Sequence, residues 1–185
     1  IDEQYGLVEI KLQGMGEPMI QGEPFFDMVR YARSKHIWVR SVTNASLLHL
    51  KDNYQKVIDS DINELMISID GADKETFEGI RRGSVFEKVV ENCKLIKAYC
   101  REKDVHRTKM WVVVQNGNRH QLDALVDLAH DMDFQSLVFS LDLTDWGDKA
   151  WADHNHAISV DDTLDTESAW KLVEKGMALG IKVAF

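Results

Sequence analysis

The chain has 185 residues, of which 44% are hydrophobic and 29% charged, with a formal net charge of −9 and two cysteines. This composition is typical of a folded globular domain with one core and no second large domain. It argues against general binding to nucleic acid or to an anionic membrane, and two cysteines are too few for a disulfide scaffold, so we expect a reducing, cytoplasmic compartment.

Short apolar runs alternate with longer segments of helical period along the chain. We predict strands over residues 8–13, 37–43, 65–70, 109–115, 136–143 and 181–185. Because most of these runs are continuously apolar, they indicate a parallel sheet that is buried on both faces. Five or six β-then-α units fit either a doubly wound sheet or a closed or partial (β/α) barrel, and the pattern alone does not choose between them.

The predicted helices carry start and stop signals. Pro24 can occupy a first helical turn, and Asn118 with Gln121 resembles a capping box ahead of an apolar stripe. Residues 145–165 are the least regular stretch, and we predict a long loop or an insertion with a short helix there.

The last predicted helix is capped by Thr166 and ended by Gly180. Its Trp170, Val173 and Met177 recur at helical spacing, so we expect them to face inward.

Polar residues gather at the carboxyl ends of the predicted strands. The first strand runs into the segment Gln13 to Pro18, and the next four run into Thr43 and Asn44, Ser68 and Asp70, Gln115 and Asn116, and Ser140, Asp142 and Thr144. In parallel α/β folds, ligands bind at this end of the strands. The alternative is that such residues only form turns and cap helices. Because five strands agree, we favour a ligand site.

The segment after the first strand suits close approach by a ligand. Gly14 and Gly16 let the backbone come near a bound molecule, and Glu17 follows them. The segment lacks the glycine and lysine pattern of a phosphate loop. A carboxylate here would suit an ammonium or hydroxyl group, and the alternative is a solvated acid at a helix entry.

Three segments resemble motifs of one enzyme family. Residues 14–18 resemble a Gly-Gly-Glu-Pro motif, Thr43 with Asn44 resembles a Thr-Asn-Gly turn, and residues 67–71 with their continuation to Asn92 resemble a fourth strand and the following helix. These are motifs of the radical S-adenosylmethionine enzymes, especially the branch with a C-terminal SPASM or twitch domain. The resemblance covers residues 5–185.

The resemblance implies an α/β fold, a partial (β/α)6 TIM-like barrel with parallel strands. Its first strand and cluster loop would precede Ile1, so residues 1–185 would be an incomplete core domain, without the N-terminal cluster-binding part or a C-terminal SPASM domain. It implies an iron-sulfur oxidoreductase that cleaves S-adenosylmethionine at a 4Fe-4S cluster to a 5′-deoxyadenosyl radical. It also implies a peptide or small-molecule substrate and an external electron donor such as flavodoxin or ferredoxin.

The resemblance also assigns cofactor-binding residues by position. Gly16 and Glu17 would lie at the methionine amino group, Ser68 at the ribose or carboxylate, and Arg81 near the carboxylate. The other cofactor-binding residues that it implies are Thr43, Asn44, Asp70, Gln115 and Leu141.

The chain lacks the family's Cys-x3-Cys-x2-Cys motif. Cys93 and Cys100 lie seven residues apart on one apolar helical stripe, so we predict that they pack in the core. His154 and His156 lack defined further ligands, and we expect no metal site on these residues. We therefore expect cluster ligands outside this chain, and the alternative is a relative that has lost the cluster.

Two rival functions stay open. A lyase or aldolase barrel would need a lysine or metal ligands at the strand ends, but Lys109 and Lys182 stand at strand starts. A catalytically silent binding or scaffold domain would explain the missing cysteine motif directly.

Overall fold

A computed structural model describes residues 6–14, 16–141, 143, 147–160 and 164–185 of the chain. The strands follow chain order in the sheet, β1-β2-β3-β4-β5-β6. The pairs β1 with β2, β2 with β3, β4 with β5 and β5 with β6 are parallel. This confirms the predicted α/β class with parallel strands. The chain divides into two compact units, residues 1–68 with 87–109 and residues 69–86 with 110–185.

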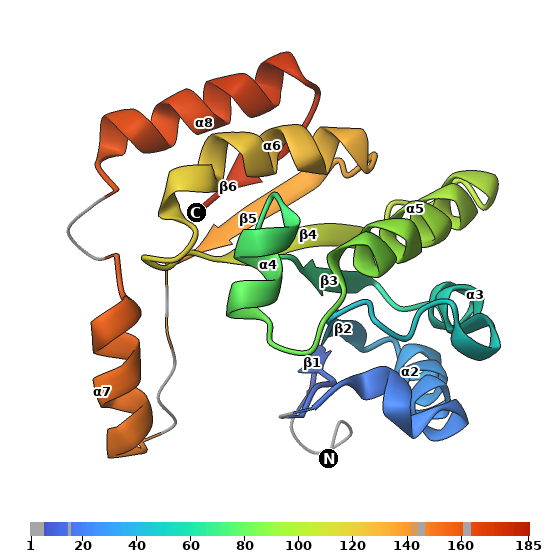
Figure 1. Ribbon diagram of the computed structural model, residues 1–185. Coiled ribbons are helices and arrows are strands. Elements are labelled where there is room, and N and C mark those ends of the chain that lie inside the picture. Colours follow the sequence, from blue (N-terminus) through green and yellow to red (C-terminus); the bar gives the residue numbers. More distant parts are fainter. Residues whose placement is uncertain (1–5, 15, 142, 144–146, 161–163) are drawn as a thin grey trace. The chain divides into compact units, whose positions relative to one another are not determined.

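The first unit alternates strands with helices (Figure 1). Its elements are β1 (Glu9–Lys11), the 3-10 helix η1 (Pro18–Gln21), α2 (Glu23–Ser34), β2 (Trp38–Thr43), η2 (Leu50–Asp52), α3 (Asn53–Asp59), β3 (Glu64–Ser68) and α5 (Phe86–Glu102, of which the first residue belongs to the second unit). Its core is made of apolar residues from the helices and strands, including Phe26, Val39 and Leu65.

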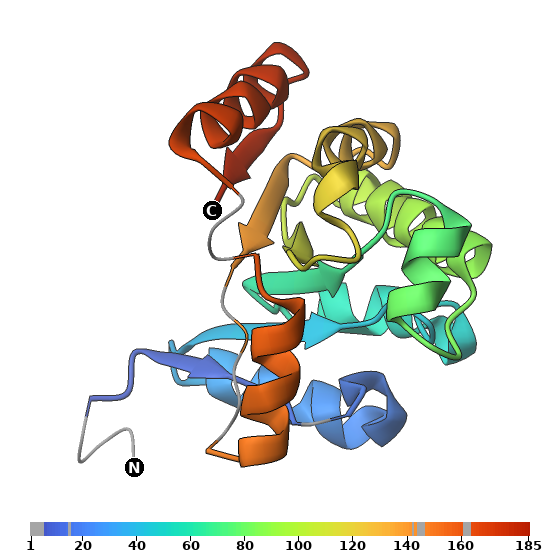
Figure 2. The ribbon, with the colours of Figure 1, turned by 60° about the vertical axis from the view of Figure 1, so that its left-hand side comes forward.

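The second unit repeats this alternation. Its elements are α4 (Lys74–Ile80), β4 (Thr108–Val113, of which the first two residues belong to the first unit), η3 (Arg119–Gln121), α6 (Leu122–Asp131), β5 (Ser136–Ser140), α7 (Lys149–Ile158), α8 (Thr166–Ala178) and β6 (Lys182–Ala184). Helices α6 and α8 lie side by side, and α7 stands apart from both in two views (Figures 1 and 2).

The apolar runs predict strands that are buried on both faces of the sheet, and most strands differ from this prediction. Every residue of β3 is buried, as expected. In β2, β4 and β5, however, buried residues alternate with half-buried ones, and β1 has no buried residue. The prediction is therefore confirmed for β3 alone, because an apolar run does not tell which side chains another layer covers.

The inward face of α8 differs from the predicted one. Trp170 and Met177 are 59% and 69% exposed, whereas Leu172 and Gly176 are buried. The prediction that Trp170 and Met177 face inward is therefore wrong. Gly180 lies just beyond the helix with φ +75°, which confirms it as the end signal.

The cap of α8 is also displaced by one residue. Asp165 is the N-cap, and its Oδ1 accepts a hydrogen bond from the N–H of Ser168 at 2.7 Å, so Thr166 is the first helical residue. The predicted short helix within residues 145–165 is confirmed as α7. Among the described residues, no helix has the length and apolar character needed to cross a membrane.

Close packing of α8 on β6 requires a glycine at position 176. A methyl group there would lie 2.4 Å from Cγ2 of Val183 and 2.9 Å from the carbonyl oxygen of Ile181. We expect Gly176→Ala to lower the free energy of unfolding by about 1–3 kcal/mol, measured by urea denaturation followed by circular dichroism. The control Gly79→Ala adds a methyl group in α4 with no atom within 4 Å, and it should raise stability by up to about 1 kcal/mol. Equal destabilisation by both substitutions would contradict the packing argument.

Candidate functional site

The carboxylate of Glu17 joins the loops that follow the first two strands. Its Oε1 accepts hydrogen bonds from the hydroxyl of Thr43 at 2.7 Å and from the N–H of Met19 at 3.2 Å. Its Oε2 accepts the N–H of Asn44 at 2.8 Å. Glu17 therefore caps η1 and fixes the turn after β2, so it is not merely a solvated acid at a helix entry.

The turn after β2 is itself held rigid. Thr43 is buried, and its Oγ1 accepts the N–H of Ala45 at 3.0 Å. Ala45 has φ +60°, the left-handed conformation for which the resembled motif uses glycine. Its carbonyl oxygen accepts a hydrogen bond from Nδ2 of the buried Asn92 in α5 at 2.7 Å. The partner groups of Glu17 therefore have fixed positions.

Glu17 keeps room for one more donor. A carboxylate has about four lone-pair positions. The described residues occupy two on Oε1 and one on Oε2, so Oε2 can accept one further hydrogen bond. Gly16, the residue before it, is exposed and has open space where a side chain would be. This geometry fits a ligand ammonium group.

In the second unit, Asp70, which follows β3 along the chain, forms an ion pair with Arg81. Oδ2 of Asp70 lies 2.6 Å from Nη2 of Arg81, and Oδ1 accepts the N–H of Val113 at 2.8 Å. Burial raises the pKa of the Asp70 carboxyl, and the charge of Arg81 and the N–H of Val113 oppose this rise. Asp70 is 3% exposed, so its carboxylate lies within the protein.

Arg81 has donors to spare. It directly follows α4, and its side chain is 24% exposed. Its Nη2 pairs with Asp70, and its Nε is buried without a hydrogen-bond partner in the described part of the chain. Because a guanidinium carries five N–H donors in a planar fork, Arg81 can bind a second carboxylate. The residues present therefore fit a ligand carboxylate here.

Asn118 and Gln121 do not form the predicted capping box, and neither side chain caps a helix. Nδ2 of Asn118 donates to the carbonyl oxygens of Asp70 at 3.0 Å and Val113 at 2.9 Å, and its Oδ1 accepts the N–H of Gln115 at 2.8 Å. Oε1 of Gln121 accepts the N–H of Ala72 at 2.8 Å. These two residues hold the loop after β3, a role that sequence reasoning missed because the same spacing is typical of a helix cap.

A glycine is also required in that loop. A methyl group at Gly71 would lie 2.4 Å from the backbone nitrogen of Phe77. The loop after β3 therefore packs directly on the backbone of α4, the helix that precedes Arg81.

The other predicted site residues lie at strand ends. The N–H of Gln115 donates to Oδ1 of Asn118, whereas the contacts described do not join Ser68, Asn116 or Leu141 to the Glu17 or Asp70 clusters. Ser68 is the buried last residue of β3, Gln115 is half-buried after β4, and Leu141 is 39% exposed after β5. Asn116 is exposed, and its N–H donates to the carbonyl oxygen of Ile158 at 2.8 Å. Met15, Asp142, Thr144 and Trp146 lie outside the described residues.

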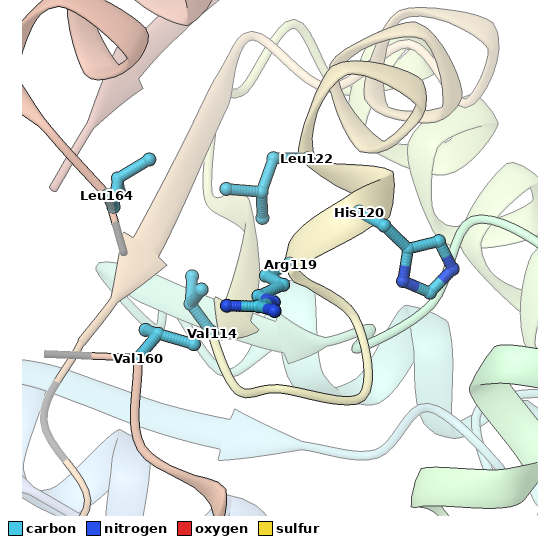
Figure 3. A pocket seen from close by; sticks show the side chains of 6 residues that line it. All are labelled: Val114, Arg119, His120, Leu122, Val160 and Leu164. Atoms are coloured by element: carbon cyan, nitrogen blue, oxygen red, sulfur yellow. The ribbon is translucent and has the colours of Figure 1, made fainter. Parts of the chain in front are cut away.

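A hollow of about 260 Å³ lies beside the end of β4 (Figure 3). It is lined by Val114, Arg119, His120, Leu122, Val160 and Leu164. Arg119 lies between the aliphatic side chains, and His120 lies apart from the other five. The residues that the sequence predicts for the site do not line this hollow.

The two cysteines are core residues, as predicted. Both are buried and free, and burial raises the pKa of the Cys93 thiol to about 12 and raises that of Cys100 as well. Metal coordination needs a thiolate, which burial disfavours. No cluster of three or more potential metal ligands occurs in the part of the chain that the structure describes. Cys93 and Cys100 therefore do not fit as ligands of an iron-sulfur cluster.

Comparisons with known proteins point to one family. The model of the radical SAM superfamily matches residues 1–129. The mycofactocin maturase MftC of Mycolicibacterium smegmatis (strain ATCC 700084 / mc(2)155) is 29% identical over 116 residues, which are 63% of this chain and 28% of that protein.

Two solved structures share the fold. Native anSMEcpe with bound AdoMet has a TM-score of 0.65 at 20% identity, covering 99% of this chain and 50% of that one. Streptococcus suis SuiB bound to the precursor peptide SuiA has a TM-score of 0.61 at 14% identity, covering 95% and 37%. This chain therefore spans half or less of the length of these relatives.

Removing one hydroxyl tests the Glu17 cluster. Thr43→Val keeps the side-chain shape but removes a donor to Glu17 and an acceptor for Ala45. We expect it to lower the free energy of unfolding by about 1–3 kcal/mol, because buried polar groups lose partners. Thr43→Ser keeps the hydroxyl and should lose less. Urea denaturation of both variants measures this difference, and similar losses would contradict the role of the hydroxyl.

The cysteines should be unreactive in the folded chain. With a pKa of about 12 for Cys93, its thiolate fraction at pH 8 is on the order of 10⁻⁴. We expect a thiol-specific chromogenic reagent to label no cysteine in the native chain and both after denaturation. Rapid labelling of either thiol in the folded state would contradict the described core packing.

Proposed function

Since this chain belongs to the radical SAM superfamily, we propose that it is the core domain of an enzyme that binds S-adenosylmethionine and a 4Fe-4S cluster. When bound, these groups supply a 5′-deoxyadenosyl radical by reductive cleavage, and that radical abstracts hydrogen from a substrate. The observation that carries the proposal is the Glu17 carboxylate, which three hydrogen bonds hold in place with one acceptor position open.

Glu17 would bind the methionine ammonium group. The open position on Oε2 accepts an N–H of the ligand, and the carboxylate charge strengthens this hydrogen bond. Thr43 and Asn44 do not need to touch the ligand, because they already donate to Glu17 and set its orientation. Gly16 is exposed and adds no side chain beside Glu17.

Arg81 would bind the methionine carboxylate. Its remaining guanidinium donors form charge-assisted hydrogen bonds with the carboxylate oxygens, and its positive charge offsets theirs. The other proposed contacts rest on the family resemblance. Ser68 would contact the ribose or carboxylate region, Gln115 would line the adenosine or the substrate, and the backbone near Leu141 would meet the adenine.

The cluster ligands would come from residues outside these 185. Cys93 and Cys100 are unsuited as ligands because both are buried in the core. The function of this chain is therefore to bind and orient S-adenosylmethionine.

We further propose a peptide substrate and membership of the SPASM branch. SuiB, a structural relative, is bound to a precursor peptide, and anSMEcpe is also known with a bound peptide. Those ligands belong to those proteins, and they support the same substrate class here. Reductive cleavage also needs an external electron donor such as flavodoxin or ferredoxin.

The second candidate is a silent binding or scaffold domain. It is favoured by the absence of the cysteine motif from this sequence. A lyase that uses a strand lysine is less well supported, because Lys109 forms an ion pair with Glu64 at the starts of β4 and β3.

The two candidates differ in what the full-length reading frame can do. If the chain is part of an enzyme, the full-length protein should show the absorbance of an iron-sulfur cluster after anaerobic reconstitution with iron and sulfide. It should also release 5′-deoxyadenosine when it is reduced in the presence of S-adenosylmethionine. Product without added peptide would still support the enzyme. The absence of both cluster bands and nucleoside would favour the scaffold.

Binding variants test the proposed ligand contacts. We expect Arg81→Gln and Ser68→Ala to weaken S-adenosylmethionine binding to the reconstituted protein, and Arg81→Gln by at least about tenfold because it loses a charge-assisted interaction. The control Cys93→Ala changes a core residue away from the proposed contacts and should stay within about twofold. Isothermal titration calorimetry measures the affinities. Equal effects of all three variants would mean that the site is misplaced.

A further inference from the structure

The family resemblance places Asp70 among the cofactor-binding residues, but its surroundings suit a different task. Building on the function proposed above, we propose that Asp70 is a positioning residue. It aims the guanidinium of Arg81 at the ligand carboxylate and does not itself touch the ligand. Asn118 in turn holds Asp70 in place.

Both carboxylate oxygens of Asp70 already have partners within the unit. Oδ1 accepts the N–H of Val113 at 2.8 Å, and Oδ2 meets Nη2 of Arg81 at 2.6 Å. With 3% of the residue exposed, little of its surface is left for a ligand. A direct contact with a ligand carboxylate would also be repulsive. Asp70 therefore acts through Arg81.

The planar guanidinium makes this pairing effective. Because the fork of Arg81 is rigid, an ion pair at Nη2 restricts the directions in which the other nitrogens can donate. The main chain of Arg81 is anchored as well, since its N–H donates to the carbonyl oxygen of Phe77 at 2.8 Å. Both ends of the side chain are then held, and the donors are oriented before the ligand binds.

Asn118 fixes the two backbone segments that place the Asp70 carboxylate. It is fully buried, and its single amide nitrogen donates to the carbonyl oxygens of both Asp70 and Val113. These are the residue that carries the carboxylate and the residue whose N–H the carboxylate accepts. A change at Asn118 should therefore displace Asp70 and, through it, the donors of Arg81.

Two ligands that differ in one carboxylate can show whether Asp70 positions Arg81 or has only a general structural role. Decarboxylated S-adenosylmethionine keeps the adenosine, sulfonium and ammonium groups but lacks the carboxylate that Arg81 would bind. In the reconstituted full-length protein, Asp70→Asn should weaken binding of S-adenosylmethionine by about tenfold while binding of the decarboxylated ligand stays within about twofold. Arg81→Lys, which keeps the charge but not the fork, should show the same selectivity. Calorimetric titration measures both affinities.

The control is Asp148→Asn, a change of the same kind at an exposed residue. Asp148 caps α7 through the N–H of Trp151, and asparagine can keep that cap, so neither ligand should bind more weakly. If Asp70→Asn weakened the binding of both ligands equally, or the binding of neither, the positioning role would be overturned. Failure of the unsubstituted protein to bind either ligand would overturn the proposed function and this assignment with it.

A second variant serves if Asp70→Asn does not fold. Asn118→Ser changes no charge but removes the amide that holds the Asp70 and Val113 carbonyl groups. A selective loss of S-adenosylmethionine binding would support the chain from Asn118 through Asp70 to Arg81. A loss shared by both ligands would overturn it.

Discussion

One interaction recurs at the carboxyl ends of the strands in both units. A carboxylate that follows one strand accepts a backbone N–H at the end of the next strand in sheet order. Glu17 after β1 accepts the N–H of Asn44 after β2, and Asp70 after β3 accepts the N–H of Val113 at the end of β4. A backbone N–H at a strand end has left the regular ladder and needs a partner, so these acids tie neighbouring loops together. The candidate site depends on this constraint.

The same interaction leaves a different chemical group available in each unit. Glu17 keeps an acceptor position of its own, whereas the buried Asp70 fixes Arg81 and leaves donors on the guanidinium. Charged groups that are oriented before a ligand arrives need little reorganisation on binding. This preorganisation is the physical basis for our proposal that Glu17 binds an ammonium group and Arg81 a carboxylate. The close packing at Gly71 and the hydrogen bonds of Asn118 maintain it.

The sequence predicted the order of strands and helices well, because periodicity of apolar residues depends on local geometry. It indicated Glu17 as a candidate binding group from its place after the first strand, but it predicted Arg81 as a site residue only through the family resemblance. It misread Asn118, since an Asn three residues before a Gln near an apolar stripe is typical of a helix cap. Helical spacing also predicted the wrong buried face for α8. Trp170 and Met177 are the larger apolar residues, but the core accepts the face with Leu172 and Gly176, because there the helix comes close to β6.

The amino-acid sequence by itself determined the α/β class, the strand-end placement of the polar residues and the burial of a cysteine pair on one helical stripe. These properties follow from composition, period and spacing within short segments. Only the tertiary structure decided which strand-end residues bond to each other. The carboxylate of Asp70 and the N–H that it accepts are 43 residues apart, and their meeting depends on how separate strands and loops align. Spacing along the chain does not determine that alignment, so the partners of Asp70 could be identified only in the fold.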